Sequence, residues 1–163
     1  MAEDWTCSST VLVSRISFVL LTVLIGNIFD GDSQSTHPSD FDMLMDVNLR
    51  SAFALINYFK DLLIKCKGCI VNLSCERGSR PDPGMLGYSM VKAGVEMLTK
   101  TFAVGFADQG VRINAVAPSY VETNLYRYMG KTDQQIRNLA SNEASCTPLK
   151  RRLEGMPADA EVR

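Results

Sequence analysis

Apolar residues are distributed along the chain in two patterns, as short uninterrupted runs and as longer stretches with a helical repeat. Runs rich in β-branched residues predict three buried strands, at Leu21–Ile25, Cys69–Ser74 and Val111–Ala117. Apolar residues spaced three and four apart predict helices at Asp40–Ile64, Tyr88–Asp108 and, with a weaker repeat, Gln134–Ala144. Because strands and helices alternate, we expect parallel strands joined by right-handed helical crossovers, which is an α/β fold.

Composition and charge narrow the classes of function. The 163 residues are 46% hydrophobic, and 17 Lys and Arg face 18 Asp and Glu, for a net charge of −1. These values fit one folded domain and argue against a nucleic-acid partner, since nucleic-acid-binding proteins carry a basic excess. The five cysteines are odd in number and unevenly spaced, which is atypical of secreted disulfide frameworks and favours a reducing compartment such as the cytoplasm.

The apolar segment Val11–Ile25 admits three interpretations. A signal peptide needs a basic start and a small-residue cleavage site, and a membrane-spanning helix needs about 20 apolar residues. The segment is shorter, Arg15 interrupts it, and Glu3 and Asp4 precede it. We therefore favour a buried strand at Leu21–Ile25 and expect no membrane partner.

Cys66 and Cys69 form a CxxC pair, which can serve as a redox dithiol or as half of a zinc site. A zinc site requires four ligands, and His37 is the single histidine. The pair also spans a turn into a predicted strand, whereas redox pairs begin a helix. We therefore interpret the pair as coincidental, expect no metal site, and place His37 in a solvated loop.

Tyr88 and Lys92 lie four residues apart at the start of a predicted helix, and hence on one helical face. A free tyrosine, with a pKa near ~10, is a poor acid or base at neutral pH, but a neighbouring cation stabilises the phenolate and lowers that pKa. The pair could therefore work as a general acid/base. A solvated helix face would produce the same spacing, so the surrounding motifs decide between the two interpretations.

Several motifs surround this pair in a fixed order. They are DVNLRSAF around Asn48, GCIVNLS in the second predicted strand, YSMVKAGVEMLTKTFAVGFADQGVRINAVAPSYVETN from Tyr88 onward and, more loosely, TPLKRRLEG. From about Leu21 to the C-terminus these stretches resemble the classical short-chain dehydrogenase/reductase family. The resemblance implies a Rossmann-like, doubly wound parallel sheet in a three-layer α/β/α arrangement, NAD(P) as cofactor and a small-molecule carbonyl or alcohol as substrate.

The resemblance also implies roles for three residues. Tyr88 matches the tyrosine that exchanges a proton with the substrate while the nicotinamide exchanges a hydride. Lys92 matches the lysine that lowers the tyrosine pKa and binds the nicotinamide ribose. Asn48 matches the asparagine whose side chain anchors a proton-relay water.

Further positions match the cofactor-contacting parts of the family pattern. Pro118, Val121 and Thr123 match the segment that contacts the nicotinamide amide and a nearby phosphate, although Ser119 stands where the family usually has glycine. The family also has an NNAG motif, which should follow the predicted strand Leu21–Ile25. Of this motif, Asn27 alone matches.

The substrate-polarising serine of the family lies thirteen residues before the tyrosine, and Cys75 occupies that position here. Its neighbour Ser74 lies on the opposite face of an extended chain. A thiol is a weaker hydrogen-bond donor than a hydroxyl, so carbonyl polarisation should be weaker if Cys75 fills the role. The sequence leaves open whether Cys75 or, after a local shift, Ser74 does so.

The chain departs most from the family pattern at its start. The family begins with a βαβαβ unit whose TGxxxGxG turn holds the cofactor pyrophosphate and whose second strand selects NAD or NADP, and neither feature occurs here. One βαβ unit takes about 30 residues, so residues 1–20 cannot encode it. We expect a member truncated at both ends, with a divergent segment over residues 1–20 and a partial Rossmann-fold domain over residues 21–163.

Two functions from different classes follow from these observations. The first is an NAD(P)-dependent oxidoreductase that interconverts a carbonyl and a secondary alcohol, with Tyr88 as general acid/base. The second is a catalytically inactive fragment that serves, if at all, as a dimerisation or interaction module, because the missing cofactor loop removes binding energy. The resemblance further implies a homo-oligomer built through the helices that carry Asn48 and Tyr88.

Overall fold

The computed structural model describes residues 11–13, 18–22, 37–122, 125–128, 130–146 and 153–154. The chain divides into two compact units, unit 1 (Met1–Ala117) and unit 2 (Pro118–Arg163). The elements of unit 1 are β1 (Val11–Val13), β2 (Phe18–Thr22), α1 (Pro38–Leu44), the π-helix η1 (Met45–Arg50), α2 (Ser51–Cys66), β3 (Cys69–Leu73), the 3₁₀ turn η2 (Glu76–Gly78), α3 (Leu86–Phe106), the 3₁₀ turn η3 (Ala107–Gln109) and β4 (Arg112–Val116). Those of unit 2 are β5 (Val121–Glu122), α4 (Leu125–Tyr128), α5 (Asp133–Cys146) and β6 (Leu153–Glu154).

The strands of unit 1 form a four-stranded sheet in the order β1-β2-β3-β4. β2 pairs with β3 and β3 pairs with β4 in parallel, with Leu20 opposite Ile70 and Ile70 opposite Ile113. These pairings confirm the predicted α/β fold with parallel strands. The strand expected at 21–25 begins earlier, at Phe18, and residues 23–25 lie outside the described part of the chain. β1, which the sequence pattern did not predict, pairs with β2 in antiparallel orientation.

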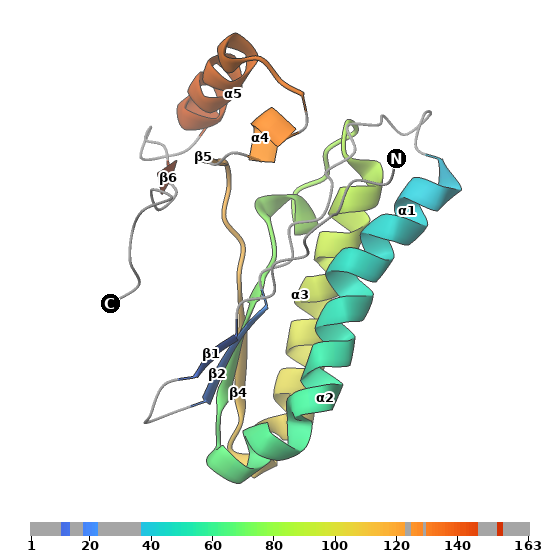
Figure 1. Cartoon of the computed structure of the whole chain (residues 1–163), viewed down its shortest axis with the longest axis vertical. Coiled ribbons are helices and arrows are strands. Elements are labelled where there is room, and N and C mark those ends of the chain that lie inside the picture. Colours follow the sequence, from blue (N-terminus) through green and yellow to red (C-terminus); the bar gives the residue numbers. More distant parts are fainter. Residues whose placement is uncertain are drawn as a thin grey trace. The chain divides into compact units, whose positions relative to one another are not determined.

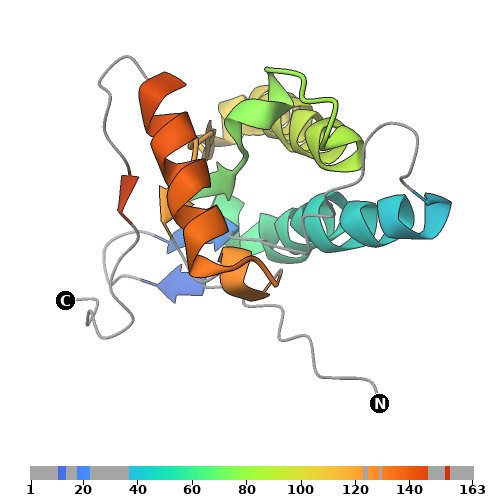
Figure 2. The same cartoon turned by 90° about the horizontal axis from the view of Figure 1, so that it is seen from above.

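The helix predicted over residues 40–64 is confirmed as a continuous helical stretch, α1–η1–α2, that runs beside α3 in unit 1 (Figures 1 and 2). It begins two residues early because the His37 ring nitrogen accepts a hydrogen bond from the Ser39 main-chain N–H at 3.3 Å, which caps the helix, and Pro38 occupies its first position. It ends at Lys67, whose left-handed backbone (φ 47°) closes the last turn.

The core of unit 1 lies between the sheet and these helices. Ile70 of β3 and Ile113 of β4 point inward and meet the inward face of α2, because side chains alternate along a strand and recur every three to four residues along a helix. The buried members are Ile56, Leu63, Ile70, Val111 and Ile113, and α3 adds Leu98, Phe102 and Phe106 around them. Gly110, in left-handed conformation, ends η3 and turns the chain into β4.

Unit 2 consists of short elements. β5 and β6 form a two-stranded parallel pair. The helix predicted at 134–144 is confirmed as α5, which buries Ile136 and Ala140. The rings of Tyr120 and Tyr126 stack with centroids 5.2 Å apart. Across the described residues of both units, no helix is long and apolar enough to span a membrane.

Candidate active site

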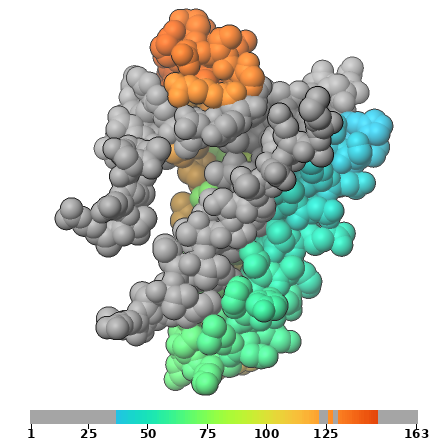
Figure 3. Space-filling view, in the orientation of Figure 1, coloured from blue at the N-terminus to red at the C-terminus, as the bar shows by residue number. Residues whose placement is uncertain are grey.

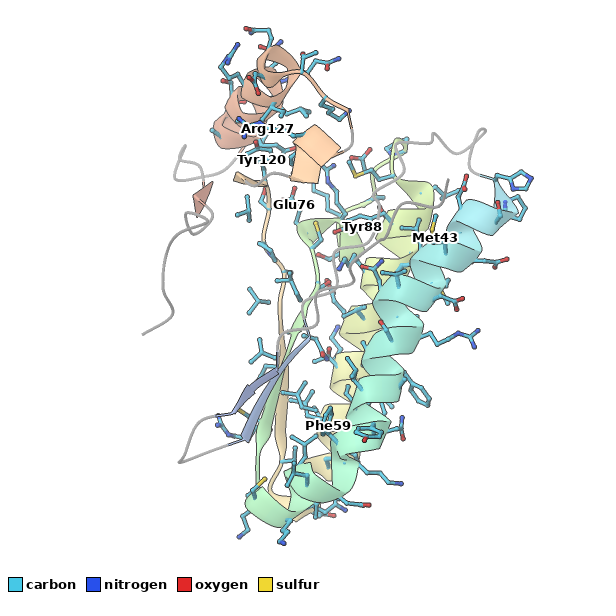
Figure 4. All side chains as sticks on the ribbon, in the orientation of Figure 1. Met43, Phe59, Glu76, Tyr88, Tyr120 and Arg127 are labelled. Carbon is cyan, nitrogen blue, oxygen red and sulfur yellow. The ribbon has the colours of Figure 1, made fainter. Side chains whose placement is uncertain are left out.

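The four residues predicted to act in catalysis lie in unit 1, on α3 and on two segments that pack against it. Tyr88 and Lys92 lie in the first two turns of α3, Cys75 follows β3, and Asn48 lies in η1. Figure 4 shows Tyr88 near the end of α3 that is remote from Phe59. The loop from Cys75 to Met85 connects β3 to α3, so Cys75 begins this loop and Tyr88 lies three residues past its end.

Tyr88 and Lys92 are both buried, with exposed fractions of 8% and 1%. The Lys92 ammonium nitrogen lies 5.4 Å from the centroid of the Tyr88 ring, close enough for a cation–π interaction. The same nitrogen donates a hydrogen bond to the main-chain oxygen of Leu73 at 3.1 Å. The predicted pairing of a phenol with a cation is therefore present in the geometry of unit 1.

Burial changes the charge equilibrium of Lys92. Desolvation lowers the pKa of its ammonium from 10.5 to about 8, and the neighbouring Cys75 opposes part of this shift because a thiolate favours the charged amine. The structure therefore places a buried, desolvated amine beside the ring of Tyr88 and near Cys75.

The structure gives the side chains of Ser74 and Cys75 different surroundings. Ser74 is buried, and its hydroxyl lies 3.1 Å from Glu96 Oε1 and 3.2 Å from the Lys92 main-chain oxygen, so both contacts hold it against α3. Cys75 is half-buried and its backbone is extended (φ −154°, ψ 155°), which turns its side chain to the opposite face. Because the Ser74 hydroxyl is already engaged, Cys75 is the better candidate for contact with a substrate.

Asn48 lies in the π-helix η1, which the sequence pattern did not predict. π-helical turns are rare and occur frequently at functional sites. Asn48 is 1% exposed, its amide nitrogen donates to the Leu44 main-chain oxygen at 3.2 Å, and its Oδ1 has no hydrogen-bond partner among the described residues. η1 packs against α3, since a Cβ on Gly94 would lie only 2.8 Å from Leu49 Cδ2. Asn48 thus offers a buried acceptor on a helical turn that packs against α3, the helix that carries Tyr88.

Sequence reasoning missed three residues that build this site. Glu96 accepts a hydrogen bond from the Ser74 hydroxyl, and Arg77 forms an ion pair with Asp82 inside the loop between β3 and α3. Glu96 lies four residues after Lys92, so the same helical spacing that linked Tyr88 to Lys92 could have identified it. Nothing in the sequence pattern indicated the pairing of Arg77 with Asp82.

The residues predicted to contact the cofactor from elsewhere in the chain are described only in part. Pro118 is the first residue of unit 2, and Val121 begins β5, where it pairs with Leu153. Asn27 and Thr123 lie outside the described residues. Within the described residues, no group of three or more His, Cys, Asp or Glu side chains is arranged to hold a metal ion.

Comparison of the sequence with known proteins identifies a matching family model and several relatives. A family model described as Enoyl-(Acyl carrier protein) reductase matches residues 10–158. The chain is 33% identical over 125 residues to an uncharacterized oxidoreductase from Bacillus subtilis, covering 75% of this chain and 46% of that protein. It is 39% identical over 110 residues to galactitol 2-dehydrogenase from Rhizobium johnstonii, covering 63% of this chain and 42% of that protein. The chain thus spans about half the length of these relatives.

Solved structures agree with the fold. The structure of ElxO with NADP bound has a TM-score of 0.72 and 28% identity, covering 83% of this chain and 54% of that one. A short-chain dehydrogenase/reductase of unknown function from Caenorhabditis elegans, solved with its cofactor, has a TM-score of 0.68 and 28% identity, covering 76% of this chain and 49% of that one. From the matching family model, the relatives and the ordered motifs around Tyr88, we conclude that the chain belongs to the short-chain dehydrogenase/reductase family.

Proposed function

We propose that the protein is an NAD(P)-dependent oxidoreductase that interconverts a small-molecule carbonyl compound and a secondary alcohol. The observation that carries the proposal is the buried ammonium of Lys92, 5.4 Å from the centroid of the Tyr88 ring. A buried cation beside a phenol stabilises the phenolate, which allows the phenol to give up and regain a proton at ordinary pH.

Tyr88 is the proton-transfer group in this proposal. In carbonyl reduction its hydroxyl donates a proton to the carbonyl oxygen as that oxygen becomes an alcohol, and in alcohol oxidation the phenolate takes the proton back. Lys92 balances the negative charge that appears on Tyr88 after proton donation. Asn48 Oδ1, buried and without a partner among the described residues, would hold a water that resupplies the proton.

Cys75 takes the position of the carbonyl-polarising group. Its thiol can donate a weak hydrogen bond to the same carbonyl oxygen that Tyr88 protonates. A weak donor stabilises the developing negative charge on that oxygen less than a hydroxyl does, so we expect modest turnover. Ser74 has a structural role in this proposal, because its hydroxyl is bound to Glu96 and to the Lys92 main chain.

The donor set fits a nicotinamide cofactor on the side of the ribose. Tyr88 and the Lys92 ammonium both carry hydrogen-bond donors suited to ribose hydroxyls. When bound, NAD(P) supplies or accepts the hydride. We propose that Pro118, Val121, Thr123 and Asn27 complete the cofactor contacts, which the family pattern supports.

The exposed apolar side chains of α2 and α3 support a homo-oligomer as part of the proposal. Figure 3 shows α1 and α2 as a continuous strip of visible surface, in blue to green. Phe53, Tyr58 and Leu62 on α2, and Met97 and Val104 on α3, are each at least 45% exposed. Apolar side chains gathered on neighbouring helices favour association with another surface. The four described cysteines are free, which supports a cytoplasmic location.

Cofactor titration tests the proposed function. NADH and NADPH are added to the purified protein, and energy transfer from its tyrosines to the reduced nicotinamide is followed. Tyr88→Phe should lower turnover of a ketone panel by about 10²–10⁴-fold while leaving cofactor affinity nearly unchanged. Tyr58→Phe, at an exposed tyrosine of α2, is the matched control. Absence of cofactor binding would favour the interaction-module hypothesis instead.

A further inference from the structure

The loop between β3 and α3 is fixed to α3 at its beginning. The Ser74 hydroxyl contacts Glu96 at 3.1 Å, and four residues further along, the main-chain N–H of Gly78 donates to the Cys75 carbonyl at 2.9 Å. Gly78 itself lies so close to α3 that a Cβ there would be 3.0 Å from the Lys92 carbonyl carbon. The chain around Cys75 is therefore held tightly on the helix that carries Lys92.

The end of the loop is organised by Asp82. Its Oδ1 accepts the main-chain N–H of Gly84 at 2.9 Å, and its main-chain oxygen accepts the N–H of Met85 at 3.0 Å. Met85 is the N-cap residue of α3, and its carbonyl accepts the N–H of Ser89 at 2.9 Å. Asp82 thus builds the turn from which α3 starts, and Tyr88 is the third residue of that helix.

Arg77 connects the two ends of the loop. Its guanidinium forms an ion pair with Oδ2 of Asp82, and its Nε lies 3.8 Å from Glu76 Oε1. The side chains of Arg77 and Asp82 are only 21% and 23% exposed, whereas those of the helical pair Arg50 and Asp46 are 80% and 61% exposed. Solvent screens a half-buried pair less than an exposed one, so the Arg77–Asp82 pair should contribute more to the conformation of its segment.

We propose that Arg77 and Asp82 are positioning residues of the proposed reaction, because their ion pair closes the loop that separates Cys75 from Tyr88. Closure fixes the turn at Asp82, and with it the start of α3, relative to the chain at Cys75. The two groups that would contact the carbonyl oxygen, the Cys75 thiol and the Tyr88 hydroxyl, are thereby held at a constant separation. The inference rests on the proposed function for its catalytic consequence but not for the loop closure itself.

Loop closure can be measured through the alkylation rate of Cys75, a half-buried thiol at the start of the loop. The rate with iodoacetamide is compared with the rate of Cys66, an exposed thiol at the end of α2, by mass spectrometry of the digested full chain. Rates are followed from neutral to alkaline pH, which separates accessibility of the thiolate from any change in thiol pKa. The readout is the alkylation rate of Cys75 divided by that of Cys66, each taken at its limiting value at alkaline pH.

Breaking the pair should open the loop. Asp82→Asn keeps an oxygen for the Gly84 N–H but removes the charge, and we expect it to raise the Cys75-to-Cys66 rate ratio on the order of fivefold. Arg77→Asp and Asp82→Arg should each raise the ratio, and the double variant that exchanges the two charges should return it toward the wild-type value. Exchange of the exposed pair Arg50 and Asp46 is the matched control and should leave the ratio unchanged.

Two outcomes would overturn the proposal. One is a ratio that stays at the wild-type value in Asp82→Asn and in both single reversals. The other is a double reversal that stays as reactive as the single variants, since a purely local disturbance of the turn would not be rescued by restored charge pairing.

The catalytic consequence has its own readout. The Asp82→Asn variant should lower kcat/KM for a carbonyl substrate, with rescue in the charge-exchanged double variant, and leave the Kd for NAD(P)H unchanged. If the protein lacks reductase activity, the alkylation ratio still reports on loop closure, so failure of the proposed function and failure of this inference are distinguishable. Tyr88→Phe should lower turnover without raising the alkylation ratio.

Discussion

The ammonium of Lys92 links the end of β3 to the start of α3: it donates a hydrogen bond to the Leu73 main-chain oxygen at 3.1 Å and lies 5.4 Å from the centroid of the Tyr88 ring. The side chain is 1% exposed. A charge in this position is costly for the folded protein, because burial removes its hydration, and the hydrogen bond with Leu73 offsets only part of that cost.

This cost predicts a pH-dependent stability. Burial lowers the pKa of Lys92 from 10.5 to about 8, so between these two values the unfolded chain binds more protons than the folded chain. The free energy of unfolding contributed by Lys92 therefore rises with pH through that window. Below the folded pKa the full penalty is present, about 3 kcal/mol on this pKa difference. Lys92→Met should thus be more stable than wild type at neutral pH, by about 1–3 kcal/mol.

Urea unfolding of both proteins over a range of pH checks this prediction. The stability difference between Lys92→Met and wild type should shrink as pH rises from about 8 toward 10.5. Lys100→Met, at an exposed lysine of the same helix, is the control and should show no such trend. A difference that is constant across the window would show that Lys92 is not desolvated as described.

Cys75→Ser tests the role of the thiol. A serine hydroxyl is a stronger hydrogen-bond donor than a thiol, and the geometry leaves position 75 on the face opposite the engaged Ser74. We expect turnover of a ketone to rise about tenfold to a hundredfold, with cofactor affinity unchanged. Cys69→Ser, at the start of β3, the strand that precedes Cys75, is the matched control. Turnover that is unchanged or reduced in Cys75→Ser would remove Cys75 from the proposed contact with the carbonyl.

Helices and strands with a regular local spacing of apolar residues could be predicted from the sequence. The helical repeat identified α2, α3 and α5, and short β-branched runs identified β3 and β4, because side-chain periodicity follows backbone geometry. The π-helix η1 was missed, since its extra residue per turn leaves apolar spacing on both sides nearly intact. β1 was missed because three residues carry too little pattern, and its pairing with β2 depends on tertiary context.

The candidate site could be predicted only where its residues are close in sequence. Tyr88 and Lys92 are four apart, so their shared helical face was evident. Ser74 meets Glu96 across 22 residues, and this contact, which separates the role of Ser74 from that of Cys75, depends on how α3 lies against β3. The expected boundary between residues 1–20 and the following domain stays a prediction.

Ser74→Ala should destabilise the fold. The substitution removes the hydroxyl that lies between Glu96 Oε1 and the Lys92 main-chain oxygen, and it leaves a partly buried carboxylate without that donor. Such a loss costs about 1–2 kcal/mol of unfolding free energy. Chemical denaturation measures the effect, with Ser79→Ala in the exposed part of the loop as control, expected to change stability by less than about 0.5 kcal/mol. Equal effects of the two variants would contradict a structural role for Ser74.

The last prediction compares two glycines, Gly78, which has no room for a side chain, and Gly105, which has open space around it. A Cβ on Gly78 would lie 2.6 Å from Glu96 Oε1 and 3.1 Å from the Ala93 main-chain nitrogen, and the α3 backbone cannot yield without shifting Lys92. A Cβ on Gly105, near the end of α3, would meet nothing within 4 Å. Gly78→Ala should therefore lower the free energy of unfolding by about 1–3 kcal/mol, whereas Gly105→Ala should raise it by about 0.5–1 kcal/mol because alanine favours the helix.

Thermal and urea unfolding of both variants check these opposite signs. In Gly78→Ala the loop must move away from α3, so the alkylation rate of Cys75 should rise together with the loss of stability, whereas Gly105→Ala should leave that rate unchanged. The structure leaves a Cβ on Gly78 only 3.0 Å from the Lys92 carbonyl carbon. A Gly78→Ala protein as stable as wild type would show that the loop does not approach α3 this closely.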